Sequence, residues 1–582
     1  MIFSLLLAAT YPQAPLPPVQ PWHGASEALV VPASDPWITP SEASGFATTP
    51  SYAETRAWID RLVKASPYLK IETFGRSPQG RDLYAVVASK PGAGKPVLLV
   101  QAGIHAGEID GKDAGLMLLR DIAVRGKAAL LDGATLLFVP IFNVDGHERA
   151  GDHNRPNQRG PNGQGWRTNA QNLNLNRDYL KADTAEMQGM IGLIRTWDPA
   201  LYLDIHVTDG IDYQYDITTD FNGFGGRYAQ SPAIGRWLDH AFRPAIETAL
   251  IRDGHKPYQY ISTIDPDPDK GIEDSASTAR FSDGYGDLRH LPTVLVETHS
   301  LKPYRQRVLG SYVLIEAALR LLARDGAGVR AAIAADRAAR PREQVLDWKR
   351  ATRPIGIRAF DGITHDMVGS AAAGGPVIRW TGRPTRIAMP IYGEAPRIVA
   401  RLPLAWWVPA TKPEVIARLR LHGVTMETIA TARTVAVDQV RLVDPVLGDA
   451  NEGHVPLTAR YVHAGVQDRY PAGSVRVPAD QPLGQLAAAM LEPESPESLL
   501  AWGFFPEILQ RTEYMEPYVV APMADAMLAR DPALAAAFAA KVKADPVFAG
   551  DAAARLAWFY ERSPYYDARY RVYPIGRELR RP

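Results

Sequence analysis

The fold depends on one stretch, Val97-Leu98-Leu99-Val100-Gln101-Ala102-Gly103-Ile104-His105-Ala106-Gly107-Glu108. Its apolar run, Val97 to Val100, predicts a strand buried on both faces. Helical spacing resumes at Asp110–Ile122, after a turn that contains two glycines. That turn carries His105 and Glu108, an imidazole and a carboxylate of the kind that bind catalytic zinc. Because a lone H-x-x-E motif is common in long chains, its meaning depends on the rest of the sequence.

The composition is that of an ordinary globular protein. Of 582 residues, 46% are hydrophobic and 22% are charged, and the 64 Lys+Arg balance the 64 Asp+Glu. The length exceeds one hydrophobic core, so about two or three domains are expected. The balanced charge disfavours nucleic-acid binding. The absence of cysteine excludes disulfides, thiolate zinc sites and a cysteine nucleophile, so any metal must be held by histidines and carboxylates.

The first residues, Met1 to Thr10, resemble the apolar core and small-residue end of a signal peptide, although they lack its basic start. We predict a leader over residues 1–20, a Pro-rich extended linker over 21–50, and a periplasmic or secreted protein. The alternatives are a frayed terminus or a start site placed too far downstream, and for the location a cytoplasmic protein. No apolar run is long enough to span a bilayer, so no integral membrane segment is expected.

Strands and helices alternate between residues 51 and 335. This order predicts an α/β domain with helices on both faces of a largely parallel or mixed sheet. In such sheets ligands bind at strand ends, and His105, His206 and Glu297 each stand at such an end. We therefore expect these three residues to meet. The predicted strands are 69–74, 83–88, 97–100, 134–142, 200–207 and 293–299. A first helix is predicted to begin at residue 51, and further helices are predicted at 110–122, 184–197, 233–251 and 309–322.

The pattern changes beyond residue 340. Short β-type segments at 377–380, 385–390 and 434–443, with a helix at 413–422, predict a β-rich accessory domain over 345–475. Ala-rich stretches at 533–542 and 552–560 predict a mainly helical region over 476–582.

Two imidazoles and one carboxylate, those of His105, His206 and Glu108, would leave one zinc ion an open position for water. Such an ion lowers the pKa of water towards about 7 and polarises a carbonyl. Glu297 is the candidate general base, because a carboxylate closing an apolar strand is costly to bury without a task or a partner. The alternative for Glu297 is a salt bridge to a nearby arginine.

Three further residues suit an anionic ligand. Arg167 could stabilise an oxyanion at the zinc-bound carbonyl. Asn176 and Arg177 form a donor pair in which the planar guanidinium can bind a carboxylate bidentately. Taken alone, each is better explained as an ordinary solvated or structural residue. Together with the possible ligands and Glu297, in this order along the chain, they indicate one site.

This ordered set resembles the zinc carboxypeptidases, the family of carboxypeptidase A-like metallopeptidases. The resemblance covers residues 50 to 325 and implies a mixed eight-stranded sheet between helices. It implies that His105, Glu108 and His206 bind one zinc ion. It also implies that Glu297 activates water and later protonates the leaving amine, while Arg167 stabilises the oxyanion. Asn176 and Arg177 would hold the C-terminal carboxylate of a peptide substrate. It rests on residues 51–62, 75–81, 105–108, 143–146, 166–167 and 176–177, the strand ending in His206, and Val296-Glu297.

The sequence also departs from the family. Where the family often has an Asp that orients a zinc-binding His, this chain has Asn174, which raises the basicity of the ligand less. The family's mobile substrate-binding Tyr has no clear match, and Tyr285 is the nearest candidate. Two other functions stay open: a zinc deacylase of the succinylglutamate desuccinylase and aspartoacylase type, and a non-catalytic peptide- or cell-wall-binding protein. The hairpin turn at 75–81 favours the peptidase, and retention of Glu297 argues against the binding protein.

Overall fold

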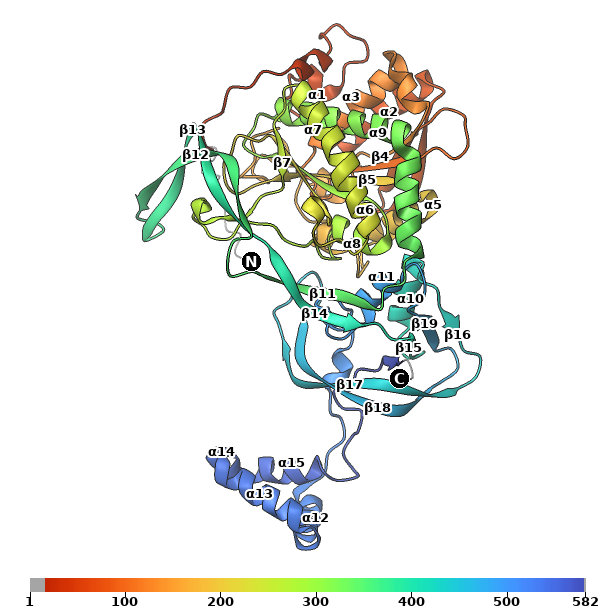
Figure 1. The fold of residues 1–582 in the computed structure, drawn as a ribbon, viewed down its shortest axis with the longest axis vertical. Coiled ribbons are helices and arrows are strands. Elements are labelled where there is room, and N and C mark those ends of the chain that lie inside the picture. Colours follow the sequence, from red (N-terminus) through yellow and green to blue (C-terminus); the bar gives the residue numbers. More distant parts are fainter. Residues whose placement is uncertain (1–15, 580–582) are drawn as a thin grey trace, which may run out of the picture.

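The computed structural model describes residues 16–579. Most of the predicted leader, residues 1–20, therefore lies outside the described residues. Figure 1 shows a layered α/β unit at the top, a β-rich unit below it and a small group of helices at the bottom. Among the described residues, no helix has both the length and the apolarity needed to cross a membrane.

An eight-stranded mixed sheet forms the centre of the α/β unit. Its strands are Leu69–Arg76 (β1), Asp82–Ala88 (β2), Val97–Ala102 (β3), Thr135–Val139 (β4), Leu201–Thr208 (β5), Ile217–Asp220 (β6), Pro257–Gln259 (β7) and Thr293–His299 (β10). Their order across the sheet is β1-β2-β4-β3-β5-β10-β6-β7. The central strands β4, β3, β5 and β10 run parallel, whereas β1 and β2 form the expected antiparallel hairpin and β6 runs antiparallel to β10. The predicted fold class is confirmed.

Helices cover both faces of this sheet. They are Tyr52–Ala65 (α2), Asp110–Val124 (α3), Val144–Glu148 (α4), Ala185–Trp197 (α5), Pro232–Trp237 (α6), Arg243–Arg252 (α7), Ser282–Arg289 (α8) and Tyr304–Ala338 (α9). Neighbouring residues of β3 enter different cores, because side chains alternate across a strand. Leu98 and Val100 pack in a core formed with α2, α3, α6, α7 and α9. Leu99 packs in a second core formed with α5, α8 and residues beyond 400.

Local sequence explains where several of these helices begin and end. Ser51 caps α2 by accepting a hydrogen bond from the Glu54 backbone, while the Glu54 carboxylate accepts one from the Ser51 N–H. The single helix predicted at 233–251 is divided by a π turn at Leu238–Phe242, next to Pro244, which has no N–H to donate. The closing helix α9 is longer than predicted, because it continues through a kink at Asp325 to bury further apolar side chains.

Residues 21–50, which we expected to form an extended linker, pack against the α/β unit instead. They contain a short 3-10 helix at Ala25–Leu29 and a helical turn at Pro40–Ala43 (α1). The Glu42 carboxylate forms a buried ion pair with Arg120 of α3, with 2.5 Å between Nη1 and Oε2. The side chains of Trp22 and Leu29 contact the first core. This segment is therefore part of the α/β unit.

The β-rich unit contains a six-stranded sheet in the order β16-β19-β15-β20-β17-β18. Its strands are Ala405–Val408 (β15), Glu427–Thr428 (β16), Arg433–Leu447 (β17), Leu457–Tyr470 (β18), Val475–Pro478 (β19) and Gly576–Glu578 (β20). Strand β20 joins β15 to β17 although it follows the helical region in sequence. The helices of this unit are Pro413–His422 (α10), as predicted, and Gly484–Leu491 (α11).

Two further pairs of strands connect the units. Glu343–Arg350 (β11) pairs with Glu394–Arg401 (β14), and Gly356–Ser370 (β12) pairs with Gly375–Tyr392 (β13). The long β12–β13 hairpin joins the α/β unit, because β13 pairs in parallel with Ile272–Glu273 (β9), itself paired with Ser262–Thr263 (β8). The β-type segments predicted at 377–380 and 385–390 are both part of β13.

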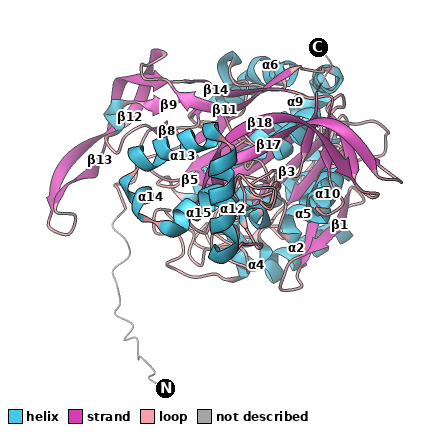
Figure 2. Cartoon of the chain, turned by 90° about the horizontal axis from the view of Figure 1, so that it is seen from below, coloured by secondary structure: helices cyan, strands magenta, loops and turns pink. Residues whose placement is uncertain are grey.

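Four helices form a separate group at one end of the molecule, in front of the other units in Figure 2. They span Pro517–Arg530 (α12), Pro532–Ala544 (α13), Pro546–Gly550 (α14) and Ala552–Tyr560 (α15). Their core is small and their own, centred on Phe538, Phe548 and Phe559. The chain leaves and re-enters the β-rich unit at one place, where the Arg571 N–H donates to the Ile508 carbonyl at 2.8 Å.

Candidate active site

Three possible metal ligands lie at the ends of two neighbouring parallel strands. His105 and Glu108 follow β3, and His206 lies in β5, one residue beyond the partner of Ala102. The turn after β3 uses Gly103 in the left-handed region, with φ +69°, which favours glycine. The predicted convergence of strand ends therefore brings His105, Glu108 and His206 together.

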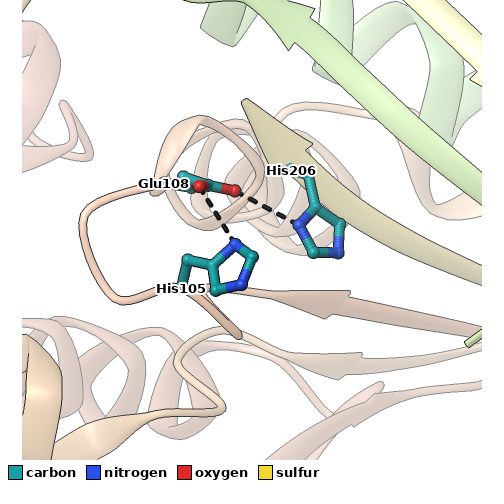
Figure 3. A group of neighbouring side chains, drawn as sticks. All are labelled: His105, Glu108 and His206. Atoms are coloured by element: carbon teal, nitrogen blue, oxygen red, sulfur yellow. Dashed lines mark hydrogen bonds and ion pairs between the residues drawn. The ribbon is translucent and has the colours of Figure 1, made fainter. Parts of the chain in front are cut away.

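The two imidazoles face one carboxylate (Figure 3). Nδ1 of His105 lies 3.0 Å from Oε1 of Glu108, and Nδ1 of His206 lies 3.2 Å from Oε2. Ligand atoms of all three residues lie within 4.8 Å of one another, and all three side chains are buried. Glu108 also accepts a hydrogen bond from the Val207 N–H at 3.0 Å.

The other ring nitrogens point away from this centre. Nε2 of His105 lies 3.1 Å from Oδ1 of Asn174, and Nε2 of His206 lies 3.0 Å from Oδ2 of Asp204. Nε2 of each ring thus lies near a side-chain oxygen while Nδ1 faces Glu108, although Nε2 of His206 is not aligned for a hydrogen bond. Side-chain oxygens behind the rings are common where histidines bind metals. Two imidazoles, one carboxylate and no thiolate fit one zinc ion with an open coordination position.

Burial and neighbouring charges set the protonation of these groups. Burial lowers the pKa of His105 to about 4, which keeps this imidazole neutral and able to bind a metal. Burial would raise the pKa of Glu108, but His105 and Arg155 outweigh it and hold the pKa well below its usual range. Burial opposes the charged form of His206, yet Asp204 outweighs it and raises the pKa of that ring. A metal on His206 would therefore replace a proton.

Arg155 belongs to the site although the sequence did not single it out. Its Nη2 donates to Oε1 of Glu108 at 2.6 Å. It passes over Gly107, where an added Cβ would lie 2.5 Å from Cγ of Arg155. Gly107 therefore leaves room for a cation beside the ligand carboxylate. The long polar loop over residues 147–172 gave no pattern that marked Arg155.

Glu297 lies beside the ligands on the adjacent strand. In the parallel pairing of β10 with β5, Glu297 is the direct partner of His206. The side chain is 9% exposed, and its Oε2 has no hydrogen-bond partner among the described residues. Burial raises the pKa of Glu297 to about 8, opposed by His206 and aided by Glu108. The salt bridge to an arginine that we considered for Glu297 is absent within the described residues.

Arg167, Asn176 and Arg177 face the same space. Nη1 of Arg167 lies 3.7 Å from Oε1 of Glu108, and its side chain is 43% exposed. The guanidinium of Arg177 lies over the ring of Phe281, 4.6 Å from its centroid. Burial, aided by the charge of Arg167, lowers the pKa of Arg177. Oδ1 of Asn176 is buried without a hydrogen-bond partner in the described structure.

One cavity of about 330 Å³ connects these groups. His206 does not line it, because its ring is 1% exposed and lies behind Glu108. Tyr260 lines the cavity, although its stretch of sequence showed no clear periodicity. Tyr285 does not line it: this residue is fully buried, and its hydroxyl lies 3.0 Å from Nδ1 of His422. The predicted residues that line the cavity are His105, Glu108, Arg167, Asn176, Arg177 and Glu297.

One known protein family matches the part of the chain that contains the candidate ligands. Residues 55–265 match the family model for zinc carboxypeptidases, a range that contains His105, Glu108 and His206 in the expected order. These residues therefore resemble a zinc carboxypeptidase domain. Glu297 lies beyond the matched residues and reaches the candidate ligands through the pairing of β10 with β5.

Two known carboxypeptidases are similar in sequence to this chain. The chain is 23% identical over 495 residues to Carboxypeptidase 2 of Trichophyton rubrum, covering 78% of this chain and 84% of that protein. It is 28% identical over 99 residues to Carboxypeptidase B of Astacus astacus, covering 16% of this chain and 33% of that protein. Both of these proteins are carboxypeptidases, and the family model matched by residues 55–265 is that of zinc-dependent peptide hydrolases.

Solved structures of similar proteins include a metallo-carboxypeptidase from Burkholderia cenocepacia, with 18% identity and a TM-score of 0.36 over 47% of this chain and 69% of that chain. They also include Carboxypeptidase A from Helicoverpa armigera, with 19% identity and a TM-score of 0.34 over 49% of this chain and 74% of that chain.

Proposed function

We propose that this protein removes the C-terminal residue from peptides at one zinc ion held by His105, Glu108 and His206. One observation carries the proposal. The unpartnered Glu297 carboxylate and the Asn176–Arg177 pair line the same cavity as the ligands His105 and Glu108. A base and an anion-binding pair facing one metal site suit hydrolysis of a bond next to a free carboxylate.

Glu297 is the proposed general base and acid. Its carboxylate takes a proton from the attacking water while the water oxygen bonds to the scissile carbonyl carbon. It then gives that proton to the leaving nitrogen as the C–N bond breaks. Zinc, when bound, acts as a Lewis acid towards the carbonyl and lowers the pKa of the attacking water. Its positive charge also favours the ionised form of Glu297, against the effect of burial.

The arginines and Asn176 bind the anionic groups of substrate and transition state. Arg167, beside Glu108 and partly exposed, is placed to donate to the oxygen that becomes negative as water adds. Arg177 and Asn176 are proposed to hold the terminal carboxylate of the peptide, through the fork of donors on the guanidinium and the amide N–H group. Binding of that carboxylate would restrict cleavage to the last peptide bond.

The first experiment compares peptides with free and amidated C-termini. Loss of the charged contact to Arg177 should raise KM for the amide by about tenfold or more. A chelator should abolish activity on the free peptide, and zinc should restore it. Equal rates on both peptides would contradict the proposal and would point to a deacylase or an endopeptidase. A purified protein that cannot be loaded with zinc would refute the metal site.

A second experiment replaces the base. Glu297→Gln should lower kcat by roughly 10²–10⁴-fold, the usual contribution of a general acid–base group, with zinc content unchanged. Glu186→Gln is a matched control, because Glu186 is also buried and its pKa is raised to about 7 by burial, but it lies outside the cavity. Its kcat should stay within about twofold of the wild type. Loss of zinc from Glu297→Gln would mean that Glu297 is a ligand instead.

We also propose that the protein is exported as a periplasmic or secreted enzyme, because Met1 to Thr10 resemble the core of a signal peptide. N-terminal sequencing of the mature protein would test this, since an intact Met1 would contradict cleavage. The catalytic domain is proposed to include residues 21–50 together with 51–335. The β-rich region at 345–475 follows, and β20 of the mainly helical region at 476–582 completes its sheet.

A further inference from the structure

Asp204 is a buried acidic residue that has no role in the proposed reaction. It lies in β5 two residues before His206, so both side chains project from the same face of the strand. Oδ2 of Asp204 lies 3.0 Å from Nε2 of His206, an ion-pair contact in which Nε2 is not aligned for a hydrogen bond. Asp204 is fully buried and does not line the cavity, so it contacts neither substrate nor water there.

A set of buried polar groups fixes the carboxylate in place. Gln101 is the direct partner of Asp204 in the pairing of β3 with β5, and its Nε2 donates to Oδ1 of Asp204 at 2.8 Å. The Tyr179 hydroxyl lies 3.5 Å from Oδ2 and 2.6 Å from the hydroxyl of Tyr202. All of these side chains are fully buried. Gln101 thus occupies Oδ1 of Asp204, while Oδ2 lies near both His206 and the Tyr179 hydroxyl.

The two candidate metal-binding histidines therefore have different supports. His105 has the amide oxygen of Asn174, 3.1 Å from its Nε2, at the position where a carboxylate was expected. His206 has the carboxylate of Asp204. A carboxylate that accepts from the remote ring N–H fixes the tautomer and makes the other nitrogen a stronger metal ligand than an amide does. The missing carboxylate at residue 174 thus has a counterpart on the other histidine.

We propose that Asp204 is the positioning residue of the metal site. It holds His206 with the proton on Nε2 and with Nδ1 directed to the ion, and it supplies the carboxylate support that His105 lacks. This assignment rests on the proposed zinc site. It concerns how tightly the ion is held and in what geometry, before any substrate binds.

Asp204→Asn tests the proposal with little change of shape. Gln101 Nε2 still requires an acceptor, so the new amide would turn its oxygen to Gln101 and its N–H group to His206. His206 would then carry its proton on Nδ1, the atom needed for the metal. If the amide turns the other way, two N–H groups face each other at Gln101. Either arrangement should weaken zinc binding by about 10- to 100-fold, measured by competition with a chromophoric chelator.

Asp212→Asn is the matched control. Asp212 is buried, and its Oδ1 lies 3.2 Å from Nε2 of His299, so it is another Asp–His pair of the same kind. His299 is not among the candidate ligands. Zinc affinity in Asp212→Asn should stay within about twofold of the wild type. The visible absorption of the cobalt-loaded protein should change in Asp204→Asn and stay unchanged in the control, because it reports the geometry at the metal.

A second variant keeps the test decisive if Asp204→Asn folds poorly. Asn174→Asp places a carboxylate on His105 while Asp204 stays in place, and zinc should then bind up to about tenfold more tightly. Unchanged or weaker binding in Asn174→Asp, or wild-type affinity in a folded Asp204→Asn, would overturn the assignment. If the wild type itself binds no zinc, the proposed function fails instead, so the two failures are distinguishable.

Discussion

The two faces of the eight-stranded sheet are covered in different ways. One face packs against α2, α3, α6, α7 and α9, so its core is complete within residues 22–333. The other face packs against α5 and α8, and residues from Leu402 to Ile575 complete that second core. The C-terminal region is therefore not an appendage of the catalytic unit. It supplies much of the second core.

Polar contacts also join the C-terminal region to the α/β unit. Glu452, between β17 and β18, accepts a hydrogen bond from the Asn174 N–H at 2.7 Å. Nε2 of His454 lies 2.7 Å from Oδ2 of Asp183, and Arg280 pairs with Glu497 at 2.9 Å. These contacts surround the loop that carries Asn176 and Arg177. The C-terminal region therefore supports the proposed substrate-binding residues Asn176 and Arg177 more directly than it supports the candidate zinc ligands.

Removing the C-terminal region should have the largest effect on folding, because it deletes part of the second core. A chain that ends at Ala339 leaves the second core without its C-terminal half and exposes apolar side chains such as Leu99 and Ile191. We expect this chain to be insoluble or to lack fixed tertiary structure, as judged by soluble yield, zinc content and near-UV circular dichroism.

The control for this truncation removes the helical group alone. Residues 511–569 can be replaced by a short Gly/Ser linker, because the backbone bond between Arg571 and Ile508 holds the two ends together. This variant should stay folded and active, since α12–α15 have their own core. A soluble, fully active 1–339 chain would show that the second core does not need the C-terminal region.

Single substitutions in the second core and in the core of the helical group should differ in their effect on stability. Trp406 is fully buried in the second core and donates from Nε1 to Glu492 at 2.9 Å. Trp406→Ala should lower the free energy of unfolding by about 3–5 kcal/mol, and activity and tertiary structure should be lost in one transition on heating. Phe538→Ala lies in the small core of the helical group, so it should leave the temperature of activity loss unchanged. Separate transitions in Trp406→Ala would argue that the units fold independently.

The smallest expected effect is at Glu452. Glu452→Gln removes the charge from the hydrogen bond to the Asn174 N–H, a loss of roughly 1 kcal/mol. Because that loop carries Asn176 and Arg177, KM for a free-acid peptide should rise about 3- to 10-fold while kcat stays within about twofold. Asp449→Asn, an exposed residue in the same loop, serves as the control and should change neither constant. An effect on kcat with unchanged KM would separate Glu452 from carboxylate binding.

Sequence alone predicted the parts of the fold that local rules determine. The strand over residues 293–299 and the helices over 413–422 and 552–560 match the structure to the residue, because periodicity and end signals agree there. The pairing of His105 and Glu108 with His206 followed from strand ends that meet at one edge. Local rules failed for α9, where tertiary burial of Val329 and Ile333 outweighed two glycines.

The parts that sequence missed depend on contacts between distant residues. Asp204 stood in a buried strand, and only its spacing of two from His206 hinted at a shared face. Arg155 lay in a polar loop without periodicity. Tyr285 was in a plausible region for a substrate-binding residue, yet its packing against His422 of the C-terminal region shows that it is a core residue. No local pattern could have predicted a partner that lies in another unit.

Strand β20 has a consequence for the order in which the protein is made. Residues 576–578 occupy the middle of the six-stranded sheet, between β15 and β17. The ribosome makes every candidate zinc ligand early and this central strand late. A nascent chain therefore holds the means to bind metal long before the sheet that supports its substrate loop can close. We expect hydrolysis to begin only after residue 578 has emerged, and assays on ribosome-stalled chains that end before residue 576 would measure this delay directly.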